Sequence, residues 1–571
     1  MKRWEIKVPN AVLRDTLAEA LHLHPITAQL LIHRGVQTVR EAEAFLSHDL
    51  SFCHDPFLFK GMERAVARLA QALKNREKVL IWGDYDVDGV TSSALLVRTL
   101  KTLGFETHCH IPHRLTDGYG LNKKFLTVAQ KKGVKVIISV DTGIAGHEAI
   151  LHLKELGMDL ILTDHHEPKA ELPKAYAIIN PLQKGCTYPF RYLSGVGLAY
   201  KLATALAKAI APEKEEEIRK HLDLVAVGTI ADLVPMIGEN HTLVYHGLRQ
   251  LERTEKVGLQ FLLSKGKTRR ETVVPRDIGF TIAPRINASG RLGSAETALN
   301  LLLTDEEEEA EGLSRQLEAG NIHRRQIQSR MLKEAMQKVD REINFTHERV
   351  IVLEDEKWHP GVVGIIASQI LHQFYRPTII IAVSGEVGRG SARSIQGFSL
   401  PAALDQCKEY LDEFGGHRMA CGITLRKENI GPFRESINRI ASTMLDPEDL
   451  VPTLSIDMEI SPEILTGSLL EEWKQLEPFG TGNAEPLFLS RGLHLTKTSE
   501  RGGGVRMALQ DAAGKPGGVA TFSPQLAREI VPFLGEPLDL VYHPSQKGSP
   551  EPMLSLAVKD FSSTKSLSEK P

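Results

Sequence analysis

Short apolar runs alternate with amphipathic stretches of helical spacing between about residues 78 and 235. Runs of this length that are followed by helices are typical of a parallel sheet whose strands are joined by crossover helices. We expect the clearest strands at residues 78–82, 136–140 and 160–163. Further strands are expected at 105–111 and 177–180, and helices at 90–103, 122–132, 148–156, 198–210 and 221–230.

The pattern changes on either side of this region. Residues 1–55 indicate a small helical lead-in, and residues 304–340 form the longest uninterrupted helical stretch, which more often links domains than fills one. The last part of the chain alternates short β-prone runs with Gly and Pro turns, as small all-β barrels do. We therefore predict an α/β fold in six segments: a lead-in (1–55), a parallel-sheet catalytic domain (56–303), a connecting helix (304–340), a smaller α/β domain (341–445), a β-barrel (446–561) and a disordered tail (562–571).

Composition places the chain among soluble globular proteins of several domains. It has 571 residues, of which 42% are hydrophobic and 25% charged, and a formal net charge of -3. This balance creates no overall field for nucleic acid, so a nucleic-acid partner would need local clusters of Lys and Arg. Two clusters occur, one at Lys265, Lys267, Arg269 and Arg270, and one on the long helix at Arg315, His323, Arg324, Arg325, Arg330 and Lys333.

The five cysteines form no CxxC pair, which argues against a disulfide framework and favours reduced thiols. The first residues, 1–7, carry charges with no apolar stretch behind them, so we expect no signal peptide. No run approaches the roughly eighteen apolar residues that a membrane-spanning helix needs. A cytoplasmic protein without a membrane partner is therefore expected.

Three acids follow the first strong strand at alternate positions, Asp84, Asp86 and Asp88. In an extended loop alternate side chains point to one side, where three carboxylates would repel each other by several kcal/mol unless cations neutralise them. The next residue, Gly89, would let the backbone approach a ligand closely. The alternative is an acidic loop in which one of these acids caps the following helix.

The next two strong strands also end in acids. Asp141 ends one, and Asp164, His165 and His166 end the other. The carboxyl ends of parallel strands are where open α/β sheets build their sites. Adjacent histidines diverge, so one can bind a metal while the other faces substrate, and Asp164 can orient an imidazole. Taken alone, Asp141 could be a turn residue, and Asp232, after an apolar helix, could be an ordinary helix end.

Carboxylate oxygens mixed with imidazole nitrogens suit manganese or magnesium, and a pair of such ions suits phosphoester hydrolysis. A zinc hydrolase site would need His or Cys pairs at helical spacing, which the sequence lacks. It also lacks the GxxxxGK[ST] sequence of a P-loop. The sequence therefore predicts a site for two divalent cations, Mn²⁺ or Mg²⁺.

These residues resemble the DHH phosphoesterase superfamily, and within it the single-strand-specific 5′→3′ exonucleases. The resemblance runs from about residue 50 to 560. The segments that match the superfamily are 84–89 (DYDVDG), 139–143 (SVDTG), 163–166 (TDHH) and 228–232 (GTIAD), and those that match the exonucleases are 284–291 (PRINASGR), 358–361 (WHPG), 388–393 (GRGSAR), 414–417 (FGGH) and 478–483 (PFGTGN).

The resemblance implies two catalytic ions with Asp141 bridging them. Many relatives have a histidine four residues before the acid that Asp86 matches, where this chain has Trp82, and this departure leaves the ligand role of Asp84 open. The residues implied are Asp86 and Asp141, with Asp84 close by, for one ion; Asp88, Asp141, His165 and Asp232 for the other; and His166, supported by Asp164, for the scissile phosphate.

The resemblance also implies a DHH-associated second domain, an oligonucleotide-binding (OB) type of barrel that binds nucleic acid, and a function. That function is the degradation of single-stranded DNA to mononucleotides from the 5′ end, in DNA repair and recombination. Single-stranded DNA is then the implied partner, and a single-strand-binding protein and a helicase are further candidates. Substrate contacts are expected from Arg285, Asn287, Arg291, Ser391, Arg393, Gly415, Gly416 and His417; the alternatives are surface arginines and a hairpin turn at the glycines.

Three rival functions stay open, one of which, a transcription- or replication-factor binding module, could only be an additional role. A small-substrate phosphodiesterase or pyrophosphatase of the same superfamily would share the metal site but would not need the terminal barrel. A non-catalytic scaffold that binds single strands would be expected to have lost motif acids, and here all of them are present.

Overall fold

The computed structural model describes residues 2–114, 120–266, 272–501, 504–510, 516–547 and 553–563. The chain forms two compact units. The larger unit comprises residues 4–110, 120–282 and 453–571, and the smaller unit comprises residues 1–3, 111–119 and 283–452. Among the described residues, no helix is both long and apolar enough to cross a membrane.

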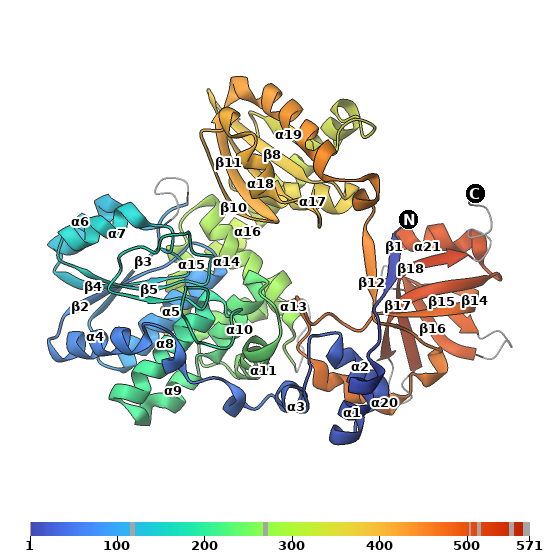
Figure 1. The fold of residues 1–571 in the computed structure, drawn as a ribbon, viewed down its shortest axis with the longest axis horizontal. Helices are drawn as coiled ribbons and strands as arrows, with labels where there is room; N and C mark the ends of the chain where they lie inside the picture. Colours follow the sequence, from blue (N-terminus) through green and yellow to red (C-terminus); the bar gives the residue numbers. More distant parts are fainter. Residues whose placement is uncertain are drawn as a thin grey trace. The chain divides into compact units, whose positions relative to one another are not determined.

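Residues 78–179 of the larger unit contain a five-stranded parallel sheet, as the sequence pattern predicts (Figure 1). In register, Trp82 pairs with Ser139, and Val140 pairs with Thr163, so the central strands end at the same edge. Residues that directly follow these strands are thereby brought together. The strand order is β3 (Thr107–His110), β2 (Lys78–Trp82), β4 (Val134–Val140), β5 (Asp159–Thr163) and β6 (Ala177–Ile179).

Helices cover both faces of this sheet because its strands are apolar on both sides. Side chains such as Leu80, Trp82 and Ile137 share one core with Leu126 and Leu153, from the two helices on one face. Those helices are α6 (Lys123–Lys131) and α7 (His147–Glu155), and the other face is covered by α4 (Met62–Lys74), α5 (Val87–Thr102) and α8 (Gly195–Ile210) (Figure 1).

Two further helices complete the body of this domain. The apolar helix α10 (Leu222–Asp232) packs against α5 and α8, and α11 (Gly238–Glu252) packs against α10. The predicted helices are thus all present, but α5 and α8 each begin three residues earlier than predicted. The reason is capping: Asp86 and Ser194 accept hydrogen bonds from the backbone N–H groups of Gly89 and Gly197.

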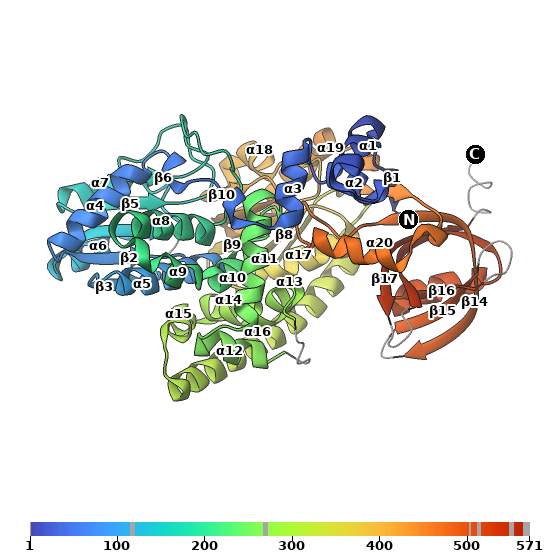
Figure 2. The ribbon, with the colours of Figure 1, turned by 90° about the horizontal axis from the view of Figure 1, so that it is seen from below.

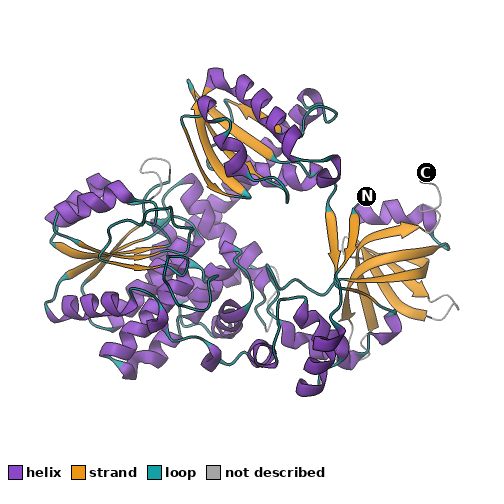
Figure 3. Cartoon of the chain, viewed as in Figure 1, coloured by secondary structure: helices purple, strands orange, loops and turns teal. Residues whose placement is uncertain are grey.

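The C-terminal strands of the larger unit close into a barrel, which confirms the predicted OB type of fold (Figure 3). Pairing of the first strand with the fourth along the chain closes the ring. The strands, in order around the barrel, are β14 (Phe488–Arg501), β15 (Gly504–Gln510), β16 (Pro516–Phe522), β18 (Met553–Ser563) and β17 (Pro537–Lys547). Of the predicted tail, residues 564–571 lie outside the described residues.

The lead-in packs against the barrel, although more than 400 residues separate them in sequence. Leu30 and Leu31 share a hydrophobic core with Trp473 and Phe488, and the Trp473 indole donates a hydrogen bond to Thr27 Oγ1 at 3.0 Å. The lead-in is mainly helical, as predicted, and it also contains a short strand that the prediction missed. These elements are β1 (Arg3–Ile6), which pairs with β12 (Thr453–Ile456), and α1 (Ala11–Leu21), α2 (Pro25–Ile32) and α3 (Val39–Ser47).

The smaller unit contains the long helix α16 (Glu307–Glu342) and a mixed five-stranded sheet. Figure 2 shows α14 (Ala283–Leu292) and α15 (Glu296–Leu303) beside α16. One face of the sheet packs on α17 (Val363–Phe374) and the other on α19 (Ile430–Met444). The strand order is β10 (Glu413–His417), β11 (Ala420–Arg426), β9 (Val387–Arg393), β8 (Thr378–Ser384) and β7 (Ile351–Asp355).

Candidate metal centre

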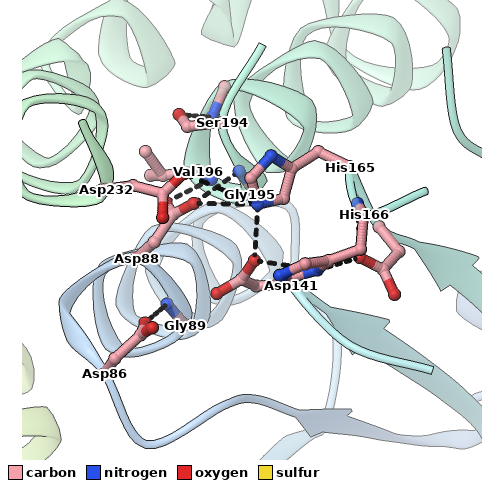
Figure 4. Close-up of polar contacts among 12 residues, drawn as sticks. Asp86, Asp88, Gly89, Asp141, His165, His166, Ser194, Gly195, Val196 and Asp232 are labelled. Atoms are coloured by element: carbon pink, nitrogen blue, oxygen red, sulfur yellow. Dashed lines mark hydrogen bonds and ion pairs between the residues drawn. The ribbon is translucent and has the colours of Figure 1, made fainter. Parts of the chain in front are cut away.

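Eight predicted residues of the larger unit converge at the carboxyl edge of its parallel sheet. Figure 4 labels six of them, Asp86, Asp88, Asp141, His165, His166 and Asp232. One of them, Asp141, has a φ of 59°, a left-handed conformation that non-glycine residues adopt only under structural constraint. These residues are Asp84 and Asp86 after β2, Asp88 in the first turn of α5, Asp141 after β4, Asp164, His165 and His166 after β5, and Asp232 at the end of α10.

The possible ligand atoms form overlapping groups. Nε2 of His165 lies 3.2 Å from Asp141 Oδ1, 3.6 Å from Asp232 Oδ2 and 4.0 Å from Asp88 Oδ2. Within each group the ligand atoms lie within 4.8 Å of one another, and the groups that share Asp141 or His165 adjoin. The groups are Asp84–Asp86–Asp141, Asp88–His165–Asp232 and Asp141–His165–His166.

The first of these groups includes Asp84, whose role as a ligand the sequence left open. An oxygen of its carboxylate lies within 4.8 Å of carboxylate oxygens of Asp86 and Asp141. Trp82, at the position where relatives have a histidine, is fully buried instead and packs edge-on against Phe125, with the ring centroids 5.2 Å apart. Asp84 is therefore placed where it could contribute a ligand, whereas Trp82 belongs to the core.

We expected residues 84–88 to form an extended loop, and this prediction is wrong for Asp88. Helix α5 begins at Val87, so Asp88 is helical, and Asp86 caps the helix by accepting a hydrogen bond from Gly89 N at 3.1 Å. The capping and the metal interpretations of Asp86 are thus compatible. Gly89 is needed for a close approach of the chain to itself, because a Cβ there would lie 2.5 Å from the carbonyl oxygen of Asp84. Its expected approach to a ligand stays a prediction.

Burial and mutual repulsion make this cluster unstable as a set of free carboxylates. Burial, reinforced by Asp86, raises the pKa of Asp88 to about 7, and burial with Asp88 raises the pKa of Asp232 to about 9. The pKa of Asp141 is raised well above its usual value by burial and by the surrounding aspartates. Divalent cations would remove this cost, and the oxygen and imidazole donors fit Mn²⁺ or Mg²⁺.

The two neighbouring histidines have different partners, although both lie near Asp141. Asp164 is fully buried; its Oδ1 lies 2.7 Å from His166 Nδ1 and its Oδ2 accepts a hydrogen bond from Ile144 N at 2.9 Å. Burial lowers the pKa of His166, but the hydrogen bond and charge of Asp164 outweigh it and raise that pKa to about 9. Asp164 therefore favours the imidazolium form of His166, whereas His165 faces the three aspartates.

The N-terminus of α8 also contacts this centre, although no sequence motif led us to predict it. The backbone N–H groups of Gly195 and Val196 donate hydrogen bonds to Asp88, to Oδ2 at 2.6 Å and to Oδ1 at 2.8 Å. Ser194, the N-cap, also contacts Thr229 Oγ1 of α10 at 2.9 Å. The sequence does indicate this helix start. Ser194 stands before Gly-Val-Gly and an Ala-rich segment, and serine is a preferred N-cap.

The predicted substrate residues all belong to the smaller unit, and four of them share one sheet face. Through β11, Ser391 aligns with Gly415, and Arg393 aligns with His417. Opposite residues of an antiparallel sheet point to the same side. The Arg393 guanidinium donates to Ser391 Oγ at 2.9 Å.

These residues lie on the α17 side of the sheet. A Cβ at Gly364, in the first turn of α17, would lie 3.0 Å from Ser391 Oγ and 3.1 Å from Arg393 Nη2. The alternative interpretation of Gly415 and Gly416 as a hairpin turn is wrong, because both lie within strand β10. Gly416 has a φ of 139°, and a Cβ there would meet the carbonyl oxygen of Ala420 at 2.4 Å.

The remaining predicted substrate residues lie on α14. Arg285 is buried and forms an ion pair with Glu318, while Arg291 donates to the carbonyl oxygen of Gly361 at 3.1 Å. Asn287 is half-buried. These contacts hold the arginines within the smaller unit, so the interpretation of Arg285 as a freely exposed surface arginine is wrong.

The predicted basic clusters are only partly exposed. Lys267, Arg269 and Arg270 lie outside the described residues. On α16, Arg324 is buried and bonds to Asn321 and Gln328, so it is not part of a basic surface. The exposed cationic side chains of that cluster are Arg315, His323, Arg325, Arg330 and Lys333.

Comparison with known proteins agrees with this architecture. Three family models match the chain: the DHH family N-terminal domain over residues 78–229, the DHHA1 domain over 347–443 and the RecJ OB domain over 456–548. The single-stranded-DNA-specific exonuclease RecJ of Escherichia coli is 33% identical over 502 residues, which cover 85% of this chain and 86% of the relative. This chain belongs to the RecJ family.

Other RecJ proteins extend the comparison. RecJ of Bacillus subtilis is 40% identical over 541 residues, which cover 93% of this chain and 67% of the relative. Among solved structures, RecJ of Thermus thermophilus in complex with Mn²⁺ superimposes with a TM-score of 0.83 at 29% identity, covering 98% of this chain and 79% of that one. That RecJ structure has also been solved with Mg²⁺.

Proposed function

We propose that this RecJ-family chain is a metal-dependent exonuclease that hydrolyses single-stranded DNA to mononucleotides from the 5′ end, in DNA repair and recombination. The observation that carries the proposal is the pair of adjoining ligand groups, Asp84–Asp86–Asp141 and Asp88–His165–Asp232, at one sheet edge. Relatives that are 33% to 40% identical carry the name single-stranded-DNA-specific exonuclease. Polarity, mononucleotide products and the preference for DNA follow from the family resemblance.

Each group would hold one divalent cation, with Asp141 shared between them. The two cations would neutralise the carboxylates, activate a water and stabilise the oxygens that attack and leave phosphorus. The sharing of Asp141 is supported by its position: its carboxylate belongs to the group with Asp84 and Asp86, and its Oδ1 lies 3.2 Å from Nε2 of His165 in the other group. Asp88 and Asp232 approach His165 from α5 and α10, so three elements must be in place before the second group exists.

His166 would bind the scissile phosphate as a cation. Its Nδ1 is occupied by Asp164, and that contact fixes the tautomer and the ring orientation. The amide of Asn180 donates to the His166 carbonyl oxygen at 2.9 Å and so holds the backbone as well. An imidazolium fixed in this way attracts a phosphate oxygen and stabilises the negative charge that develops on it.

The smaller unit would bind the strand. Ser391, Arg393 and His417 share a sheet face and offer a hydroxyl, a guanidinium and an imidazole, donors that suit phosphate. Burial lowers the pKa of Arg393, yet the group stays charged because guanidinium pKa values are so high. Contacts to the backbone of a single strand bind without reading its sequence.

The cellular setting is a further part of the proposal. All five cysteines are free thiols, which fits the reducing cytoplasm. A single-strand-binding protein and a helicase are proposed as protein partners, because a single-strand exonuclease needs a supply of unpaired DNA. A pull-down of the full chain with each candidate tests these partners directly.

The activity test uses the full chain with Mn²⁺ and four substrates: 5′-labelled and 3′-labelled single-stranded DNA, duplex DNA and a dinucleotide. We expect the 5′ label to be released as a mononucleotide at once, and the 3′ label to be retained in a shrinking ladder, with the duplex resistant. Cleavage of the dinucleotide alone would overturn the proposal in favour of a small-substrate phosphodiesterase. Binding of single strands with no cleavage of any substrate would favour the non-catalytic scaffold.

A further inference from the structure

The carboxylate of Asp88 is held from both sides by a helix that begins 107 residues later in the sequence. Gly195 N donates to one oxygen at 2.6 Å and Val196 N to the other at 2.8 Å, and Asp88 is 1% exposed. We call these two N–H groups the amide clamp. Hydrogen bonds from a helix N-terminus to a carboxylate are charge-assisted, and the positive end of the helix dipole offsets part of the negative charge.

The clamp requires close packing that only glycine permits. A Cβ at Gly195 would lie 2.7 Å from Cβ and 2.9 Å from Oδ1 of Asp141. A Cβ at Gly228, on α10, would lie 2.4 Å from Oγ1 of Thr91 on α5, 2.7 Å from Cγ1 of Val196 and 2.9 Å from Oδ1 of Asp88. The first turn of α8 thus touches both Asp88 and Asp141, and α10 lies against the clamp itself.

Helix α10 also carries Asp232, four residues after Gly228. Residues four apart lie on one face of a helix. Asp232 and Gly228 therefore lie on the same face of α10, and at Gly228 this face has no room for a side chain. The hydroxyls of Ser194 and Thr229 lie 2.9 Å apart and join the start of α8 to the same helix. The clamp therefore fixes Asp88 on α5 relative to Asp232 on α10.

We propose that the amide clamp is a positioning element of the metal centre, which prepares the group Asp88–His165–Asp232 for its cation. The inference rests on the two-cation site proposed above. Each N–H group donates a hydrogen bond to a different oxygen of the Asp88 carboxylate, and together they stop the carboxylate from rotating. The carboxylate therefore meets the cation in one orientation. The group Asp84–Asp86–Asp141 has no member in the clamp, and disturbing Asp88 alone leaves it intact.

Mn²⁺ binding to the full chain without DNA, followed by calorimetry and electron paramagnetic resonance, tests the proposal. In Gly228→Ala the new methyl group pushes against Thr91 on α5 as well as against Val196 and Asp88. We expect one of two Mn²⁺ ions to bind about tenfold more weakly and the other to keep its affinity within about twofold. In Gly195→Ala the methyl group pushes against the shared Asp141, and both ions should bind more weakly. Gly197→Ala is the matched control, because its Cβ would meet the side chain of Leu193, 3.2 Å away, and both affinities should stay within about twofold.

A second variant with a smaller structural change controls for misfolding of Gly228→Ala. Thr229→Val keeps the shape but removes the hydroxyl contact to Ser194, and we expect a few-fold loss at the same ion only. Wild-type affinity for both ions in Gly228→Ala and Thr229→Val would overturn the clamp, as would equal loss of both ions in Gly228→Ala. Failure of the proposed function looks different: the wild type would then bind two Mn²⁺ ions in this pattern without hydrolysing single-stranded DNA.

Discussion

The buried carboxylate of Asp164 pairs with the half-buried imidazole of His166, with Oδ1 and Nδ1 2.7 Å apart. His165 stands between them in the sequence; its Nε2 faces Asp88, Asp141 and Asp232, and its ring centroid lies 4.5 Å from that of His166 (Figure 4). One short segment after β5 thus supplies one imidazole that lies among possible metal ligands and one that is paired with a carboxylate.

Asp164→Asn should remove the charge that keeps His166 protonated. In the metal-free protein, NMR of labelled histidines should show His166 titrating at about 9 in the wild type and toward about 6.5 in the variant. Because the folded pKa is raised, the pair stabilises the fold fully below about pH 6.5 and loses this contribution as the pH rises through 9. Titration of His166 near 6.5 in both proteins would contradict the pairing.

Asp141→Ala should abolish hydrolysis while leaving strand binding largely intact. The carboxylate belongs to the group with Asp84 and Asp86 and lies 3.2 Å from His165 Nε2 of the other group, so in the proposed bridging role its loss affects both cations. The proposed strand contacts lie in the smaller unit. We expect a fall of at least about a thousandfold in the rate of single-strand cleavage with Mn²⁺. Fluorescence anisotropy with a labelled oligonucleotide provides the binding measurement, and retained cleavage would exclude the bridging role.

Acid should destabilise the larger unit through His241. This ring stacks on Phe45 with centroids 4.1 Å apart, its Nε2 lies 3.2 Å from the carbonyl oxygen of Leu476, and burial lowers its pKa to about 3. Since the unfolded chain binds the proton at about pH 6.5, stability falls as the pH drops from there toward 3, by about 2 kcal/mol at pH 5.

Denaturant unfolding at pH 7.5 and pH 5 measures this loss. His241→Phe keeps the stacking but has no titratable ring, so the difference between the two pH values should shrink. An unchanged difference in the variant would show that His241 is not responsible.

Removal of residues from about 451 onward should weaken binding of DNA more than turnover of short oligonucleotides. The barrel would supply binding surface, whereas every member of the two ligand groups lies before residue 233. The deletion also uncovers Leu30 and Leu31, which pack on Trp473, so a lower melting temperature is expected as well. Parallel loss of binding and short-substrate turnover in a folded deletion variant would contradict a separate role for the barrel.

Local patterns carried most of the fold prediction. Strand ends at Trp82, Val140 and Thr163 follow from apolar runs that any parallel strand shows, and the acids behind them were visible for the same reason. Helix starts were less predictable, because they depend on the capping bonds of Asp86 and Ser194, and the sequence does not show which of several nearby polar residues caps a helix. Strand β1 was missed because its partner β12 is about 450 residues away, and a four-residue edge strand has no pattern of its own.

The sequence by itself determined the α/β class, the order of strands and helices, and which acids and histidines end at the sheet edge, because periodicity and capping chemistry act over a few residues. The tertiary structure alone decided that Asp88 is held by Gly195 and Val196, that Arg285 is paired with Glu318, and that Ser391 and Arg393 share a face with His417. These contacts join elements far apart in the chain. They exist only once the helices and sheets have packed and buried charges have found partners, which no local pattern records.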